Sequence, residues 1–263
     1  MSDSLGRAPA RLLVPAGLAT LLLVLPLVSL LLTAPWSMLG EQLGTEALRQ
    51  AMWLSVLTAT VATGVCLLLG LPLAWVLARV DFPGRRLLRT LVIVPLVLPP
   101  VVAGVALVSA FGRTGIIGEP LRAATGLSLP YTTAGVIVAH VFVSLPFVVI
   151  SIEGALRSAH QEYDAAAATL GASRWHAFRT VTVPLALPGI AAGMVLAWAR
   201  SLGEFGATIT FAGNYPGTTQ TMPTLIYLSI NSHPEAAKTL SLVLLLLSLA
   251  VLVALRDRWL VTS

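Results

Sequence analysis

The residues best suited to chemistry in this sequence are Arg200 and Glu204, which stand four positions apart. Side chains at that spacing share one face of a helix, so the two can form an ion pair. Thr208, Thr210 and Asn214 follow and add neutral hydrogen-bonding groups. A charged pair beside an apolar run is costly unless it has a task. We expect these five residues to line a pathway for a polar solute, with a purely structural Arg200–Glu204 pair as the alternative.

A second candidate constellation, His140 with Ser144, does not favour an enzyme. Both residues lie on one predicted helix, and no acidic residue is in evidence to orient the imidazole as a triad would require. We therefore interpret His140 as a hydrogen-bonded packing residue. The single cysteine, Cys66, excludes an intrachain disulfide framework and a cysteine-based metal site. We expect no catalytic residues and no bound metal.

Composition indicates what must position these groups. The chain has 263 residues, of which 57% are hydrophobic and 10% charged, with a mean hydropathy of +0.90. Soluble domains carry about 25% charged residues, so the composition does not favour a soluble enzyme. The net charge of +5 does not indicate a nucleic-acid partner, because the arginines lie in short gaps between apolar runs. The sequence predicts an all-α integral membrane protein embedded in the lipid bilayer.

Six apolar segments approach the roughly 20 residues of helix that cross a bilayer. The six predicted transmembrane helices cover residues 12–33, 52–78, 91–111, 133–152, 181–199 and 240–255. With the N-terminus inside, most of the flanking basic residues lie in the cytosol, among them Arg85, Arg86, Arg89 and Arg157. Basic residues favour the cytoplasmic side, so we expect both termini to be cytoplasmic.

The chain divides into three predicted parts. Residues 1–50 form an N-terminal extra transmembrane helix with an outer loop, and residues 51–255 form the core domain. Residues 256–263 form a cytoplasmic tail. The core contains an inside loop, residues 153–180, whose middle reads EYDAAAATLG. The acidic start, the alanines and Gly171 predict a short helix with a smooth face, suited to a groove in another protein.

This loop resembles a known motif. The pattern A-A-x-x-x-G from Ala166 to Gly171, followed nine residues later by V-x-V-P from Val181 to Pro184, is similar to the EAA loop of ABC importer permeases. The sequence departs from the family pattern at Ala165, where the family usually has an acidic residue. Asp164 stands one position earlier.

The resemblance implies a type I ABC importer permease fold whose loop couples to a cytoplasmic ATPase. The coupling residues would be Asp164, Ala166, Ala167 and Gly171. We further expect a homodimer that binds two copies of the ATPase, because a closed symmetric pair is the commonest assembly of identical chains. No phosphate-binding pattern G-x-x-x-x-G-K-[ST] occurs in the sequence, so we expect no cofactor on this chain and ATP to act through the partner.

The run GEFGATITF, with the following N-x-P-G-x-T-x-T-x-P from Asn214 to Pro223, is similar to the molybdate permeases of that family. The likeness extends over about residues 50–230. It implies import of molybdate delivered by an external binding protein across a bacterial cytoplasmic membrane. Tungstate or sulfate are alternative substrates. An ion-coupled secondary transporter is a further alternative, although the acidic residues nearest to the spans, Glu153 and Glu204, lie toward span ends rather than at the midplane.

Overall fold

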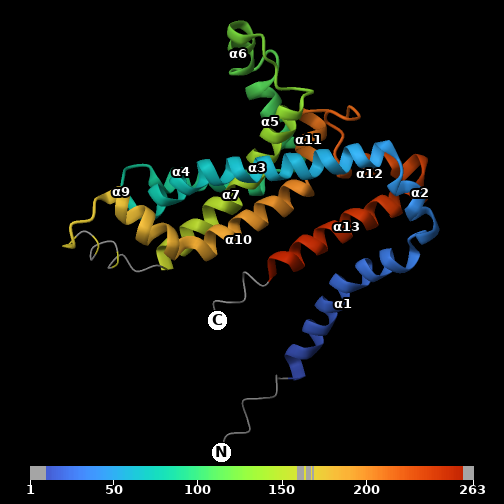
Figure 1. The fold of residues 1–263 in the computed structure, drawn as a ribbon, viewed down its shortest axis with the longest axis horizontal. Helices are drawn as coiled ribbons and strands as arrows, with labels where there is room; N and C mark the ends of the chain where they lie inside the picture. Colours follow the sequence, from blue (N-terminus) through green and yellow to red (C-terminus); the bar gives the residue numbers. More distant parts are fainter. Residues whose placement is uncertain (1–9, 159–162, 164–166, 168, 257–263) are drawn as a thin grey trace, which may run out of the picture.

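The computed structural model describes residues 10–158, 163, 167 and 169–256, and the regular structure in these residues is entirely helical (Figure 1). The predicted all-α architecture is confirmed. A 3₁₀ turn at Trp36–Met38 and a π-helical segment at Phe178–Thr182 accompany the α-helices. The α-helices are α1 (Ala10–Thr33), α2 (Leu39–Leu43), α3 (Glu46–Arg79), α4 (Arg85–Val97), α5 (Pro100–Phe111), α6 (Gly118–Thr125), α7 (Thr133–Ser158), α9 (Arg174–Ala177), α10 (Val183–Leu202), α11 (Gly206–Phe211), α12 (Met222–Ser232) and α13 (Pro234–Arg256).

Within the described residues, five helices are long and apolar enough to cross a bilayer, or six if the bent pair α4–α5 forms one span. Helices α3, α7 and α10 pack against one another and form the centre of the molecule. Figure 1 shows α1 standing apart from this centre, with its upper end near α2 and α13. The large apolar side chains along α1 are exposed, among them Leu22 and Leu32, as expected for a helix in contact with lipid.

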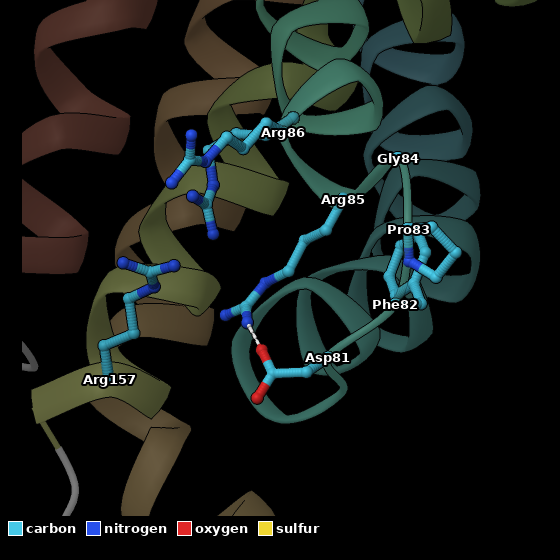
Figure 2. Close-up of a pocket in the computed structure, with 8 residues that line it drawn as sticks. Asp81, Phe82, Pro83, Gly84, Arg85, Arg86 and Arg157 are labelled. Atoms are coloured by element: carbon cyan, nitrogen blue, oxygen red, sulfur yellow. Dashed lines mark hydrogen bonds and ion pairs between the residues drawn. The ribbon is translucent and has the colours of Figure 1, made fainter.

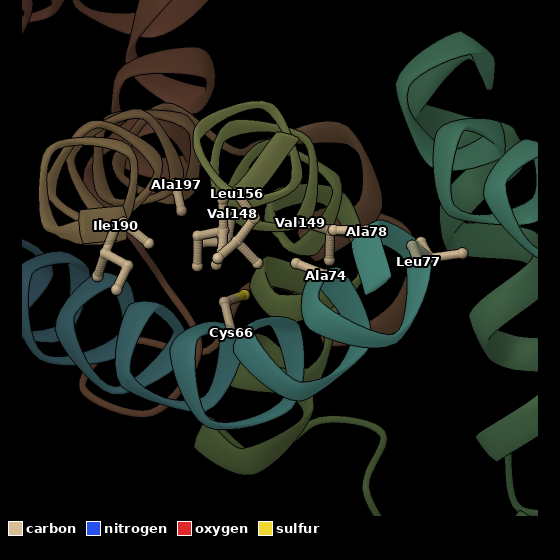
Figure 3. Close-up of a cluster of buried hydrophobic side chains, with 11 residues drawn as sticks. Cys66, Ala74, Leu77, Ala78, Val148, Val149, Leu156, Ile190 and Ala197 are labelled. Carbon is tan, nitrogen blue, oxygen red and sulfur yellow. The ribbon is translucent and has the colours of Figure 1, made fainter. Parts of the chain in front are cut away.

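Small residues let the three central helices approach closely. The buried cluster between them contains Cys66 and Ala74 of α3 opposite Val148 and Val149 of α7 (Figure 3). A Cβ atom on Gly193 of α10 would lie 3.0 Å from the Val148 Cα atom. Membrane helices associate through close packing rather than through a hydrophobic driving force. The small residues therefore position the central helices.

One predicted span is bent in the structure. The apolar run 91–111 predicts one span, and within it α4 and α5 meet at an angle of 119°. The chain breaks at Leu98, where the backbone is extended (φ −65°, ψ 132°), and Pro99 is extended as well. Each of these residues precedes a proline, and a residue before proline disfavours the helical conformation. The second half of the run turns away to pack on α11.

Other predicted spans are confirmed in position but are longer in the structure. Helix α3 begins at Glu46, where the Thr45 hydroxyl accepts a hydrogen bond from the Leu48 N–H at 3.3 Å. Helix α13 begins at Pro234, and Glu235 and Lys238 form an ion pair of 3.1 Å within its first turns. Hydropathy underestimates both helices, since their first turns carry charged residues that pair with one another, Glu46 with Arg49 and Glu235 with Lys238.

Candidate functional site

The candidate pathway residues lie at a second break, between α10 and α11. Helix α10 ends at Leu202, Gly203 follows as its C-cap, and α11 begins at Gly206. Arg200 in the last turn of α10 forms an ion pair with Oε2 of Glu204, just beyond the helix end. The predicted pairing of these two residues is confirmed, although Glu204 reaches its partner from the connecting turn and not from the helix.

Glu204 connects the two sides of this break. Its side chain is 1% exposed, and its Oε1 atom accepts a hydrogen bond from the Ala207 N–H at 2.9 Å. An N–H in the first turn of a helix has no partner within that helix, and a carboxylate is favourable there. The two oxygens of one buried carboxylate thus hold Arg200 of α10 and the first turn of α11 together.

The two broken helices meet at the same place. A Cβ atom on Gly206 would lie 2.4 Å from the Pro100 Cβ atom, so the first residues of α11 and α5 are in direct contact. One turn further on, a Cβ atom on Gly104 would lie 2.5 Å from the Cβ atom of Thr210. Non-helical backbone at membrane depth is tolerated where it is buried in protein or lines a cavity. The paired breaks are therefore a candidate for the moving part of a transport pathway.

The remaining predicted pathway residues are not all gathered around Arg200. Thr208 is fully buried, and its hydroxyl has no hydrogen-bond partner among the described residues. The hydroxyl of Thr210 donates to the Gly206 carbonyl at 2.8 Å. Asn214 is half-buried beyond the end of α11, with a buried side-chain oxygen that lacks a partner in the described part of the chain. No hydrogen bond between described residues joins these three to the Arg200–Glu204 pair.

A buried polar layer lies between the central helices next to this junction. The Ser144 hydroxyl of α7 and the Ser201 hydroxyl of α10 are 2.9 Å apart, and both residues are fully buried. His140 is buried one turn away on α7, beside the Thr58 backbone of α3 and within electrostatic range of Arg200. His140 is thus a packed residue of the helix core, as expected, but the expected hydrogen bond is not found, because neither ring nitrogen has a hydrogen-bond partner among the described residues. The sequence spacing does not reveal its proximity to Arg200.

The predicted coupling loop is described only in part. Asp164 and Ala166 lie outside the described residues, whereas Ala167 is helical and half-buried. Gly171 has a φ of +82°, and the Ala172 N–H donates to the Ala167 carbonyl at 3.0 Å. A left-handed glycine with this six-residue hydrogen bond is a Schellman motif, which terminates a helix. The prediction that Gly171 ends a short helix is confirmed.

Exposed apolar side chains surround this helix end. Leu170 is 88% exposed and Trp175 is 65% exposed. Between the loop and the next turns lies a cavity of about 630 Å³ that Ala167, Gly171 and His176 help to line. Exposed apolar groups beside a concave surface are typical of an interaction site.

Aromatic side chains that the sequence analysis does not identify connect this loop to the helix core. Trp175 of α9 stacks on Phe178 with ring centroids 5.5 Å apart, and Phe178 meets the edge of Trp75 on α3 at 6.1 Å. Aromatic pairs in these geometries add about 0.5–1.5 kcal/mol beyond the area they bury. Trp75 and Phe178 are far apart in the sequence, and no spacing pattern relates them. Displacement of the loop would therefore reach α3 directly.

Among the described residues, no group of three or more histidine, cysteine, aspartate or glutamate side chains could hold a metal ion.

Comparison with solved structures identifies the fold. A crystal structure of a bacterial ABC transporter involved in the import of the acidic polysaccharide alginate contains a chain that superposes with a TM-score of 0.73. The match covers 96% of this chain and 95% of that chain at 19% identity. The helical architecture is therefore that of an ABC importer permease.

Residues 70–262 match the family model described as the inner membrane component of binding-protein-dependent transport systems, and the chain belongs to this family. It is thus a multi-pass permease of the inner membrane, a component distinct from the ATPase, and the family implies an ATPase and a binding protein as partners. A molybdenum transport system permease protein of Mycobacterium bovis is 47% identical over 95% of this chain and 94% of its own length. A sulfate transport system permease protein of Escherichia coli is 38% identical over 85% of this chain and 82% of its own length.

Proposed function

We propose that this chain is the membrane-spanning subunit of an ATP-driven importer that carries molybdate delivered by an external binding protein. The observation that carries this proposal is the 47% identity to a molybdenum permease along nearly the whole of both chains. The identity to a sulfate permease is lower and covers less of the chain. Sulfate and tungstate are tetrahedral dianions like molybdate, so they are the competing substrates.

The transporter is a homodimer in which each copy docks one ATPase. Closed twofold dimers are the commonest symmetric assembly of identical chains, and each chain has one loop of the coupling type. Residues 51–255 form the transport core of each copy, α1 is an additional helix, and residues 256–263 are a cytoplasmic tail.

The coupling segment transmits the movement of the ATPase. The coupling residues are Asp164, Ala166, Ala167 and Gly171, of which Ala167 is helical and Gly171 ends the helix. The exposed Leu170 and Trp175 support this role, because apolar side chains on a water-facing surface are suited to burial against a partner. The aromatic contacts from Trp175 through Phe178 to Trp75 provide a rigid connection to α3.

The junction between α10 and α11 lies on the pathway. Glu204 is buried and holds α10 and the start of α11 together, whereas the Arg200 side chain is 32% exposed. A guanidinium group has five N–H donors, so Arg200 can pair with Glu204 and still attract an oxyanion. The hydroxyl groups of Thr208 and Thr210 and the amide of Asn214 offer neutral contacts as the ion passes.

Uptake of radiolabelled molybdate by cells that express this chain with its ATPase and binding protein tests the substrate. We expect unlabelled molybdate to abolish uptake and excess sulfate to leave most of it. Tungstate resembles molybdate most closely in size and charge, and we expect it to compete. If sulfate competes as well as molybdate does, the substrate assignment is wrong while the assignment to an ABC importer stands.

A further inference from the structure

A basic cavity at the other end of the helix bundle is not used by the transport function described above. It has a volume of about 730 Å³ and lies between α4 and the end of α7 (Figure 2). Four arginines line it together with the turn at residues 81–84. The arginines are Arg85, Arg86 and Arg89 of α4 and Arg157 of α7.

This cavity lies on the cytoplasmic side. The basic residues around it are those that the positive-inside rule assigns to the cytosol. It also lies far along α10 from Arg200, because Ala155, close to Arg157, packs against Gly189 near the start of α10. The cavity is therefore separate from the candidate pathway junction, and its function does not rest on the proposed substrate.

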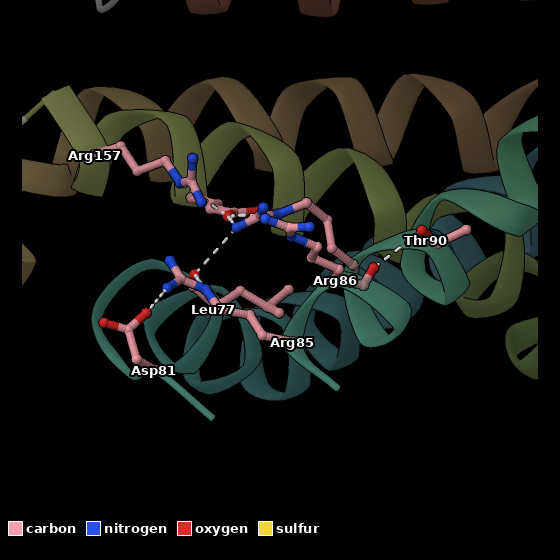
Figure 4. A network of polar contacts seen from close by, with 8 residues as sticks. Leu77, Asp81, Arg85, Arg86, Thr90 and Arg157 are labelled. Carbon is pink, nitrogen blue, oxygen red and sulfur yellow. Dashed lines mark hydrogen bonds and ion pairs between the residues drawn. The ribbon is translucent and has the colours of Figure 1, made fainter. Parts of the chain in front are cut away.

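Hydrogen bonds and ion pairs hold three of the four arginines in place (Figure 4). Arg89 and Arg157 both donate to the same oxygen of Glu153, each through its Nε atom at 3.0 Å. Arg85 forms an ion pair with Asp81 and donates from Nε to the Leu77 carbonyl at 2.8 Å. These contacts join the end of α3, the start of α4 and the end of α7.

The positive charge around the cavity exceeds the negative charge. In the described part of the chain, two carboxylates, Asp81 and Glu153, pair with the arginines that line it, and their partners are Arg85, Arg89 and Arg157. Arg86 is exposed and takes part in none of the ion pairs among the described residues. Figure 2 shows the ends of Arg85, Arg86 and Arg157 turned toward the same space. Among the described residues, the four arginines therefore carry two more charges than the two carboxylates that pair with them.

We propose that this cavity binds a tetrahedral oxyanion group of the phosphate type on the cytoplasmic side. The planar guanidinium fork matches such a group, and the bonds that fix three arginines leave other N–H groups free to donate. Two sources of the group fit the surroundings. One is the headgroup of an anionic phospholipid, whose chains could follow the exposed Leu87 and Leu91 of α4. The other is a free oxyanion of the cytosol.

The bound group would neutralise the unpaired charge and add a connection between α4 and α7. Helix α4 leads directly into the break at Leu98, so the occupied cavity would hold the inner half of the bent span in place. We therefore expect binding to raise the thermal stability of the chain.

The full-length chain in nanodiscs tests the proposal. One arm compares the melting temperature in phosphatidylcholine with that in phosphatidylcholine plus phosphatidylglycerol, and the second arm titrates inorganic phosphate in phosphatidylcholine alone. The variants are Arg86→Gln and the double change Arg86→Gln with Arg157→Gln. Both should fold, because Glu153 keeps Arg89 as a partner. Arg174→Gln is the matched control, since Arg174 is an exposed arginine of the same end that does not line the cavity.

We expect either phosphatidylglycerol or inorganic phosphate to raise the melting temperature, and to raise it by the same amount in the native chain and in the Arg174→Gln control. Arg86→Gln should raise the half-saturating ligand concentration about tenfold, as expected for loss of one charged hydrogen-bonding partner. The double variant should not be stabilised by the ligand at all. Arg86→Lys, which keeps the charge, should retain most of it. Stabilisation in the first arm identifies the lipid headgroup, and stabilisation in the second identifies a free anion. If neither ligand stabilises the chain, or if the cavity variants respond like the control, the proposal is overturned.

Discussion

Gly206, the first residue of α11, lies directly against Pro100, the first residue of α5, with a distance of 2.4 Å between the Pro100 Cβ atom and a Cβ placed on the glycine. This contact joins the two interrupted helices of the core at their breaks. Each break alone would leave backbone groups without partners in the membrane. Their contact buries the start of α11, whereas Pro99 and Pro100 at the other break stay exposed, and the junction depends on a residue without a side chain.

Replacing Gly206 by alanine should therefore destabilise the protein. Real Cβ atoms essentially never lie within 3.0 Å of a non-bonded atom of a distant residue, so α5 and α11 must separate, at a cost of about 1–3 kcal/mol. We expect a lower melting temperature in detergent and reduced transport. Gly203→Ala is the matched control at the same junction, since its nearest neighbour would be the Ala199 carbonyl oxygen at 3.7 Å. Equal effects of the two changes would contradict the close-contact explanation.

A double-mutant cycle separates the two roles of Arg200. Arg200→Gln removes the partner of the buried Glu204 and should cost roughly 3 kcal/mol, the lower end for breaking a buried pair, because Arg200 is partly exposed. Glu204→Gln removes the charge but keeps an oxygen that can accept from the Ala207 N–H. The double change should recover most of the thermal stability.

Transport by that double variant decides whether Arg200 acts on the ion. If Arg200 attracts the passing oxyanion, the double variant folds and still transports poorly, because the cation has been removed. Recovery of transport along with stability would show that Arg200 only pairs with Glu204. Both properties are measured for the native chain, the two single variants and the double variant.

The end of the coupling helix gives a third prediction. Gly171 adopts a left-handed conformation, but no atom lies within 4 Å of a Cβ placed there, so a substitution is limited by backbone strain of about 1–2 kcal/mol. Gly171→Val should reduce co-purification with the ATPase and its stimulated hydrolysis, while membrane insertion is unchanged. Gly171→Asn should retain more of both, because asparagine tolerates this conformation. Equal behaviour of valine and asparagine would mean that the helix end does not matter for coupling.

Ala166→Glu, which places a charge on the predicted smooth face, should abolish docking of the ATPase.

The aromatic connection from the loop to α3 gives a fourth prediction. Phe178→Ala removes the ring that lies between Trp175 and Trp75. We expect the variant to keep ATPase binding and hydrolysis but to lose most of its transport per ATP hydrolysed, because loop displacement no longer reaches α3 firmly. Phe178→Leu keeps apolar volume without the aromatic contact and should be intermediate. The measurement is uptake and hydrolysis on the same proteoliposomes, with Trp53→Ala, an exposed aromatic elsewhere on α3, as control. If transport per ATP hydrolysed is unchanged in Phe178→Ala, these rings do not transmit movement from the loop to α3.

Apolar runs predict most of the helices but not the bend between α4 and α5. Hydropathy is continuous from residue 91 to residue 111, so it indicates one span. The prolines at 99 and 100 indicate a possible break, yet many membrane helices tolerate proline. The outcome depends on a tertiary contact, since α5 turns to pack Gly104 against Thr210 of α11. Such a contact between distant segments has no periodic signal in the sequence.

The features of the candidate site that depend on residues close together in the sequence were predictable. A spacing of four residues is sufficient to pair Arg200 with Glu204, and Gly171 is a helix-ending residue by type. The second bond of Glu204, to the Ala207 N–H, depends on where α10 ends, and helix ends are harder to predict than helices. The proximity of His140 to Arg200 depends on how α7 and α10 pack, which no local pattern indicates.

Reconstitution tests the central claim most directly. The chain, its ATPase and the binding protein are incorporated into liposomes, and accumulation of radiolabelled molybdate is followed with ATP on the ATPase side. We predict uptake that requires ATP, the binding protein and this chain together, and that is lost with Ala166→Glu. Uptake driven by an ion gradient without ATP, or ATP-dependent accumulation of sulfate but not of molybdate, would contradict the account.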